Sequence, residues 1–395
     1  MLHSRLLAFV ALAALAVLLP WATGVIRNAL AETGTRVTTA LPSWVAPGAR
    51  LHIRGWTTPS TPVRLSIGTR VRRVTSRPRG RFDFRVRAPG DVGRYPVTVR
   101  AAGTRIELGV LRVRPLLLAA VGDVTFGDGV ATAIRLYGAR YPWRSVAPVI
   151  RSADIAVANL EGAVSRRGRP WPGKQYTFRG PPRALRAAAS YAGLDAVSVA
   201  NNHSLDYGRI AFRDTLRYAR RFGIAPFGGG RDLETARRPA VLRAGNLRVA
   251  LVGFSDVRPL GWDAGPYTSG TLPAFPTVVA STIRAAGRRA DLVVAYFHWG
   301  VERSRLPTAR QRELARAAFG AGAKIVLGAH PHVLQPIARD GRRLVAWSLG
   351  NFVFAASSPN TERTGILRIR LGAWGVLGRS LRRARIVGVQ PRLVG

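Results

Sequence analysis

Polar residues that can bind metal ions follow one apolar segment after another along this chain. Four of the six histidines occupy such positions. A bound Mn, Fe or Zn ion needs neutral imidazole or carboxylate groups that converge from rigid elements. The sequence contains no cysteine, which excludes thiolate ligands. The candidate ligands, which come from five separate loops, are Asp123, Glu161, Asn202, His203, His298, His330 and His332.

The apolar segments that precede these residues predict buried strands alternating with helices. We expect strands at residues 116–121, 155–158, 196–200, 247–254, 292–297, 325–327, 344–347 and 365–370. We expect helices at residues 182–192, 210–222, 276–288 and 308–321, the last one capped by Thr308. Such alternation is typical of an α/β fold with a buried sheet. The polar residues would then share the carboxyl edge of the sheet, where α/β folds bind ligands.

Each of these residues alone also has an ordinary structural explanation. A lone histidine after a strand often hydrogen-bonds a loop, and a lone aspartate often caps a helix. The joint pattern favours ligation, and the His330-Pro331-His332 piece adds to it. Residues two apart in a straight strand face the same side, and the proline fixes the turn between them. We therefore expect both imidazoles to approach one metal cluster.

The motifs around these residues resemble those of the CapA or PGA_cap family of bacterial poly-γ-glutamate capsule proteins. The Asn-Asn-His-x-Leu-Asp-Tyr-Gly and His-Pro-His pieces are specific, and all the pieces occur in the family's order over residues 116–371. The matching pieces are Val121-Gly-Asp-Val, Asn159-Leu-Glu161, Ala200-Asn-Asn-His-Ser-Leu-Asp-Tyr-Gly208, His298-Trp-Gly-Val-Glu302, Gly328-Ala-His-Pro-His-Val-Leu-Gln335 and Ser348-Leu-Gly-Asn-Phe-Val-Phe354.

The resemblance implies a fold related to calcineurin-like metallophosphoesterases, an α/β/β/α sandwich with a two-metal centre. By this resemblance Asp123 and His332 bind one metal, His298 and His330 bind the second, Glu161 bridges them, Asn202 is a further ligand and His203 is catalytic. One departure concerns the first motif, because phosphoesterases have Asp-x-His where this chain has Asp123-Val124-Thr125. The number of divalent ions, one or two, therefore stays open.

The mechanism that these roles imply is hydrolysis. A metal lowers the pKa of bound water and supplies hydroxide, which would attack a phosphorus atom or an amide carbonyl. His203 would protonate the leaving group, either oriented by Asp206 or with Asp206 closing the Leu-Asp-Tyr-Gly turn. Lys174 and Arg179 are candidates for binding an anionic substrate. Gln335 and Asn351 are expected to support loops.

The residues before the α/β region predict two further segments. Residues 1–31 have a basic start, an apolar run and an Ala-Leu-Ala triplet, which indicate either a cleaved signal peptide or a membrane anchor. Residues 35–115 alternate apolar and polar side chains between turns, which predicts an all-β, immunoglobulin-like sandwich in which His52 is a structural strand residue. Residues 116–395 form the predicted metallohydrolase domain, placed outside the cytoplasm.

The net charge of +41 comes almost entirely from arginine. It points either to an anionic partner or to a compositional bias, and the even scatter of the arginines favours bias as the main cause. No nucleic-acid-binding motif occurs, so nucleic acid is not an expected partner.

Three functions remain in competition. The first is a metallohydrolase acting on an acidic cell-surface polymer together with capsule synthesis machinery at the membrane. The others are a non-catalytic component of capsule assembly or export and an exported phosphoesterase.

Overall fold

The computed structural model describes residues 34–394 of the chain. The predicted signal peptide or anchor at residues 1–31 lies outside this range. Within the described range, no helix combines the length and apolar character needed to span a membrane. The chain divides into two compact units, one with residues up to Trp44 and Arg50–Val113, the other with Val45–Ala49 and the residues from Arg114 onward.

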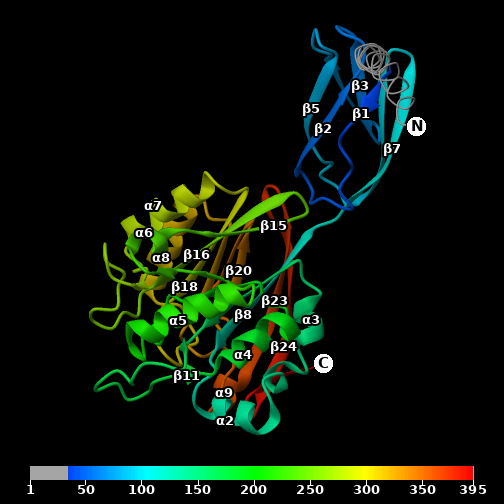
Figure 1. The fold of residues 1–395 in the computed structure, drawn as a ribbon. Helices are drawn as coiled ribbons and strands as arrows, with labels where there is room; N and C mark the ends of the chain where they lie inside the picture. Colours follow the sequence, from blue (N-terminus) through cyan, green and yellow to red (C-terminus); the bar gives the residue numbers. More distant parts are fainter. Residues whose placement is uncertain (1–33, 395) are drawn as a thin grey trace, which may run out of the picture. The chain divides into compact units, whose positions relative to one another are not determined.

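The first unit is built from antiparallel strands in two small sheets. One sheet has the order β1 (Arg36–Val37), β2 (Arg50–Trp56), β5 (Arg81–Arg87), and the other β4 (Arg70–Thr75), β3 (Pro62–Ile67), β6 (Gly93–Ala101), β7 (Thr104–Val113) (Figure 1). In β2, Leu51 and Ile53 are buried while His52 between them is exposed, so the alternation fixes which face packs inward. The unit is therefore all-β, and its immunoglobulin-like character stays a prediction.

The second unit contains two larger sheets. The eight-stranded sheet has the order β13 (Ala225–Phe227), β12 (Ala196–Ser198), β9 (Ile155–Leu160), β8 (Leu116–Val124), β23 (Arg363–Gly372), β24 (Gly375–Val387), β25 (Gln390–Leu393), with β22 (Asn351–Val353) also paired to β8. The six-stranded sheet has the order β15 (Ala240–Ala244), β16 (Leu247–Ser255), β18 (Leu292–His298), β19 (Ile325–Ala329), β21 (Arg343–Ala346), β20 (Ile337–Asp340). Two short pairs, β10 (Ala163–Val164) with β11 (Arg179–Gly180) and β14 (Gly229–Gly230) with β17 (Gly270–Thr271), complete the strands of this unit.

The central strands of both sheets run parallel, as the predicted α/β region requires. These are β13, β12, β9 and β8 in one sheet and β16, β18, β19 and β21 in the other. All residues of β9 and β18 are buried, since helices cover one face and the other sheet lies on the opposite side. Tyr296 of β18 donates a hydrogen bond from Oη to the carbonyl of Val121 in β8 (2.7 Å), which ties the two sheets together.

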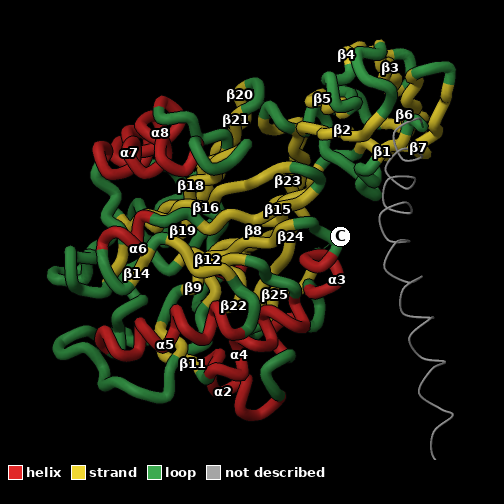
Figure 2. The backbone as a smooth tube through the Cα atoms, turned by 45° about the horizontal axis from the view of Figure 1, so that its top comes forward, coloured by secondary structure: helices red, strands yellow, loops and turns green. Residues whose placement is uncertain are grey.

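Helices pack on the outer faces of the two sheets, so the unit is a mixed α/β fold (Figure 2). One apolar core joins the eight-stranded sheet to α2 (Asp128–Tyr137), α3 (Ala147–Arg151), α4 (Pro182–Ala187), the π-helical turn Ala188–Ala192 and α5 (Gly208–Arg221). The 3₁₀ turn Tyr141–Trp143 also belongs to this core. A second core joins the six-stranded sheet to α6 (Leu233–Arg237), α7 (Pro276–Gly287) and α8 (Ala309–Gly320). The short α9 (Pro359–Glu362) precedes β23.

The start of α8 connects the helix layer to the candidate site. Thr308 caps the helix as predicted: its Oγ1 accepts a hydrogen bond from Gln311 N (3.2 Å), and Gln311 Oε1 accepts one from Thr308 N (2.9 Å). The buried Gln311 side chain also donates to Gln335 Oε1 (3.0 Å). Gln335 in turn donates to the carbonyls of Ser304 and Leu306, which confirms its loop-supporting role.

Candidate metal centre

Glu161 lies at the centre of the candidate site. It directly follows β9, is completely buried, and neither of its carboxylate oxygens has a hydrogen-bond partner in the described part of the chain. Its Oε1 is surrounded by three imidazole Nε2 atoms, those of His298 at 3.7 Å, His203 at 3.8 Å and His332 at 3.9 Å. A buried carboxylate without donors is costly unless a cation compensates it. These distances leave room for a cation between the groups.

The pKa values of Glu161 and of the histidines around it are shifted from their ordinary values. Burial, and then the nearby carboxylate of Asp123, raise the pKa of Glu161 well above its ordinary value. Burial alone would lower the pKa of His332, but Glu161 and Asp123 together raise it to about 10. Burial lowers the pKa of His298 and brings that of His330 to about 4, with the other histidines adding to both shifts. Two imidazoles are thus neutral at physiological pH, the form that binds metals.

His330 and His332 lie just past β19 in a bent loop. This corrects the straight-strand geometry expected for them, because both adopt positive φ angles, 93° and 58°. Such a conformation is strained for a non-glycine residue, and strain of this kind clusters at functional sites. The two rings nevertheless approach each other, with centroids 5.8 Å apart. Ligand atoms of Glu161, His330 and His332 all lie within 4.8 Å of one another, and the buried Nδ1 of His330 has no partner among the described residues.

Asp123 occupies the end of β8, directly opposite Asn159 of β9. Its Oδ1 accepts a hydrogen bond from Asn159 Nδ2 (2.8 Å), and its Oδ2 accepts one from His330 N (3.1 Å). The same Oδ2 lies 3.5 Å from His332 Nδ1. Asp123 is thereby fixed beside the two histidines of the bent loop.

Asparagine side chains hold the ligand candidates in place. Asn202 Oδ1 lies 2.7 Å from His298 Nε2, so this nitrogen carries the proton and donates it. Asn159 Nδ2 donates toward His298 Nδ1 (3.3 Å), and Asn201 Nδ2 donates to Asn159 Oδ1 (3.2 Å). Asn351 Oδ1 accepts from His332 Nδ1 (2.8 Å), which leaves the Nε2 of that ring facing Glu161. Partners of this kind fix the ring orientation and tautomer of metal-binding histidines.

Asp206 positions the imidazole of His203. Its Oδ2 lies 2.7 Å from His203 Nδ1 and accepts a second hydrogen bond from Phe178 N (2.6 Å). The Phe178 ring stacks on the imidazole, with centroids 4.3 Å apart. His203 Nε2 therefore points toward Glu161. Burial lowers the pKa of His203, and Asp206 opposes that shift.

The two predicted substrate-binding residues lie in different surroundings. The ammonium of Lys174 pairs with Asp206, donates to the carbonyl of Asn202 and lies over the ring of Trp262 (4.7 Å). Lys174 is thus part of the site. Arg179 instead donates to the carbonyl of Gly168 (3.1 Å) and lies over the Tyr207 ring (4.2 Å), so its guanidinium is held by groups other than the ligand candidates.

The departure in the first motif has a structural consequence. Thr125, which stands where phosphoesterases have a histidine, accepts a hydrogen bond from Gly127 N (3.2 Å) and is buried. It supports the turn before α2. The sequence prediction did not include Asn159, Asn201 and Phe178 as site residues. Asn159 and Asn201 had a signal in their places within the family motifs, whereas Phe178 lies outside those motifs.

Comparison with known proteins identifies the family. Residues 117–356 match the sequence profile described as bacterial capsule synthesis protein PGA_cap. The chain belongs to the PGA_cap family. The matched range contains every candidate ligand and leaves out the all-β unit, the helix α9 and the strands β23, β24 and β25.

Similar proteins include two with capsule-related names. The PGA biosynthesis protein CapA of Bacillus subtilis (strain 168) is 32% identical over 64% of this chain and 66% of its own length. The capsule biosynthesis protein CapA of Bacillus anthracis is 30% identical over 65% of this chain and 64% of its own length. The match thus spans just under two thirds of each PGA_cap relative. A hypothetical protein from Thermus thermophilus aligns over 69% of this chain and 100% of its own, with 15% identity and a TM-score of 0.45, too low to support a functional conclusion.

Proposed function

We propose that this protein is an extracytoplasmic metal-dependent hydrolase that processes an acidic surface polymer, such as poly-γ-glutamate, during capsule synthesis. The observation that carries the proposal is the buried, donor-free carboxylate of Glu161 among three imidazole Nε2 atoms. The capsule-related names of the Bacillus relatives support the choice of polymer.

The residues present fit a divalent cation. Glu161 and His330 both have buried ligand atoms without a partner among the described residues, and His332 completes a compact triad. Asp123, Asn202 and His298 would add ligands for one or two ions, and the absence of thiolates suits Mn, Fe or Zn. When bound, the metal supplies an acidified water as the nucleophile. The proton now on His298 Nε2 would leave on binding, so loading is expected to release protons.

The proton for the leaving group would come from His203. Asp206 holds the proton of Nδ1, which directs Nε2 into the site. A lowered pKa makes the protonated ring a stronger acid, which favours transfer to an amide or ester leaving group. Lys174 would fix Asp206 and place a positive charge near an anionic substrate.

The relation to metallophosphoesterases and the placement of the whole chain are parts of the same proposal. Two sheets between helix layers and a His-rich carboxyl edge agree with the α/β/β/α class that the motifs imply. The all-β unit would act as an immunoglobulin-like spacer, with residues 1–31 as signal peptide or membrane anchor. Capsule synthesis machinery at the membrane is the expected partner.

The test is cleavage of poly-γ-glutamate by the full-length, Mn-loaded protein, measured as new amino termini. His203→Gln should lower the rate about 10²–10⁴-fold, the usual contribution of a general acid. His52→Gln is the matched control, because it removes an exposed imidazole from the all-β unit and should change nothing. A metal-loaded protein that cleaves no polymer would favour a non-catalytic assembly role. Phosphate release from model esters instead would assign an exported phosphoesterase.

A further inference from the structure

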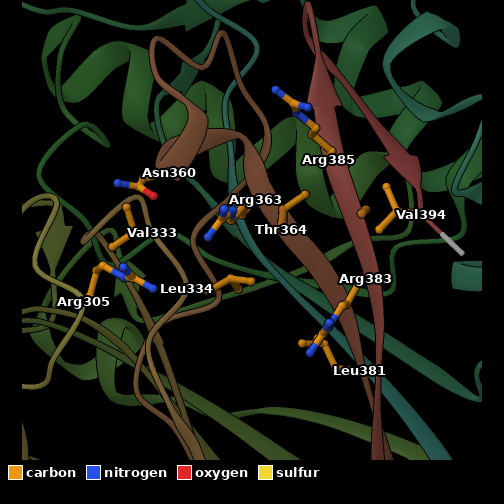
Figure 3. Close-up of a pocket in the computed structure, with 11 residues that line it drawn as sticks. Arg305, Val333, Leu334, Asn360, Arg363, Thr364, Leu381, Arg383, Arg385 and Val394 are labelled. Carbon is orange, nitrogen blue, oxygen red and sulfur yellow. The ribbon is translucent and has the colours of Figure 1, made fainter.

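A cavity of 480 Å³ lies in the α/β unit beside the loop that follows His332. Its volume is within the ~300–1,000 Å³ typical of ligand sites. Figure 3 shows the residues around it, which come from the loops after β18 and β19, from α9, from the long strands β23 and β24 and from the residue after β25. Four of them are arginines: Arg305, Arg363, Arg383 and Arg385.

Three of these arginines carry charge that no carboxylate neutralises. Arg385 pairs with Glu362 (2.7 Å), whereas Arg305, Arg363 and Arg383 have no acidic side chain within ion-pair distance in the described part of the chain. All three are exposed. In Figure 3 the side chains of Arg305 and Arg363 point toward one another. The cavity therefore presents unpaired guanidinium groups, which bind carboxylates well.

A high arginine content alone does not produce this arrangement. Another cavity of similar size, 490 Å³, is lined by five arginines along α5 and α6. Three of those five are paired, Arg217 with Asp214, Arg231 with Asp232 and Arg238 with Glu234. The cavity beside the His332 loop thus differs from its arginine-rich background in leaving most of its cations free.

The rest of the lining indicates what kind of anion fits. Apart from the polar Asn360 and Thr364 it is aliphatic, and it contains no aromatic side chain; the aliphatic residues are Val333, Leu334, Leu381, Ala384 and Val394. Thr364, which also lines the cavity, is 1% exposed, and its Oγ1 has no hydrogen-bond partner among the described residues. A ligand that carries carboxylates on a chain of methylene and amide groups would match this lining. Its carboxylates would meet the arginines, its methylene groups the aliphatic side chains, and its amides the Thr364 hydroxyl. Nucleic acid would need stacking surfaces that the lining lacks.

The cavity is linked to the candidate metal centre through two short connections. Val333 and Leu334, in its wall, directly follow His332. Asn351 joins the two sites from the other side, since its Oδ1 accepts from His332 Nδ1 and its Nδ2 donates to the carbonyl of Thr361 (3.3 Å). Thr361 directly follows Asn360, which lines the cavity. A polymer held in the cavity would therefore lie beside the histidine loop.

We propose that this cavity is a binding subsite for a linear polycarboxylate chain, and that it holds the acidic polymer next to the candidate metal centre. The choice of polymer as the substrate rests on the proposed function, whereas binding in the cavity does not depend on catalysis.

The test measures binding without metal. Labelled poly-γ-glutamate oligomers are titrated with the metal-free, full-length protein, and the Kd is obtained from fluorescence anisotropy at low and high salt. Arg363→Gln/Arg383→Gln removes two unpaired cations from the cavity. Arg213→Gln/Arg220→Gln is the matched control, because it removes the same charge from the other arginine-rich cavity and leaves that cavity's three ion pairs intact. Thermal unfolding verifies that both variants fold.

We expect the cavity variant to weaken binding at least tenfold, ~1.4 kcal/mol, because hydrogen bonds to charged groups are lost. The control variant should change the Kd less than about twofold, as expected for distant exposed charges. Equal weakening by both variants would overturn the proposal, since binding would then follow overall charge. Polyphosphate bound as tightly as poly-γ-glutamate would overturn the assignment to polycarboxylates. Because metal is absent, a failure of the hydrolase proposal leaves these outcomes unaffected.

Discussion

Two buried carboxylates of the α/β unit, Glu161 and Asp214, have opposite surroundings. Asp214 of α5 accepts hydrogen bonds from Ser165 Oγ (2.7 Å), from Arg167 Nε (2.9 Å) and from Arg217 (2.9 Å). The hydrogen bond from Arg167, above the other causes, lowers the pKa of Asp214 to about 2. Glu161 has no donor among the described residues, and its pKa is raised.

The difference teaches that Asp214, a structural carboxylate, is surrounded by donors, whereas both oxygens of Glu161 are left without one among the described residues. The chain has 61 basic residues, so a donor for Glu161 would be easy to supply. Three imidazole Nε2 atoms, those of His203, His298 and His332, surround it instead. A buried carboxylate that lacks hydrogen-bond donors in this way is best explained by a bound cation that neutralises its charge.

Asp206 is a third buried carboxylate, and among these three its substitution is expected to have the largest effect. It is satisfied like Asp214, but by groups of the site, namely His203, Phe178 N and Lys174. Asp206→Asn should lower the rate of polymer cleavage about 10–100-fold, because the imidazole loses the acceptor that fixes its Nδ1 proton. The pH–rate profile should also shift to lower pH, since Asp206 supports the protonated ring. A lower rate with an unmoved profile would make Asp206 merely structural.

Asp214 is expected to contribute to stability and to nothing else. Its folded pKa is depressed, from 3.8 to about 2, so its contribution is full above the ordinary value and is lost as the pH falls toward the folded one. Asp214→Asn should therefore cost about 2 kcal/mol of unfolding free energy at neutral pH. Urea unfolding at a series of pH values measures this difference, which should shrink below pH 3.8. A difference that is independent of pH would contradict the assigned ion pairs.

Glu161 should show the opposite and smallest stability effect. Glu161→Gln replaces a buried group without donors by a neutral one, while Asp123 stays beside the protonated His332. We expect the metal-free variant to be about 1 kcal/mol more stable than the metal-free wild type. Metal should stabilise only the wild type. The comparison between the two carboxylates would break if Glu161→Gln destabilised the metal-free protein as much as Asp214→Asn.

The central sheet strands could be predicted because they are continuous apolar runs. Each of the eight predicted strands of the α/β region has a counterpart, from β8 to β23, with ends that differ by a few residues. The strand β24 was missed because arginines interrupt its alternation, as in Arg-Ser-Leu-Arg-Arg-Ala-Arg. Such strands form because a neighbouring strand supplies their backbone hydrogen-bond partners. The pattern of one segment alone does not reveal that neighbour.

The residue types at the candidate site could be predicted, but their partners could not. Strand ends place Asp123, Glu161 and His298 at one edge from apolar pattern alone. The pairing of Asp123 with Asn159 depends on the register between β8 and β9, which a sequence does not state. The positive φ angles of His330 and His332 likewise arise from the surrounding packing, so the straight geometry expected for them was wrong.

The most direct test of the account is metal content. The full-length protein, its Glu161→Gln variant and its Asp214→Asn variant are stripped with chelator, reloaded with Mn, Fe or Zn, and analysed for bound metal. The account predicts one or two equivalents in the wild type and in Asp214→Asn, and loss of the metal in Glu161→Gln. Equal metal in all three proteins, or no specific metal in any, would contradict the claim that Glu161 is reserved for a cation.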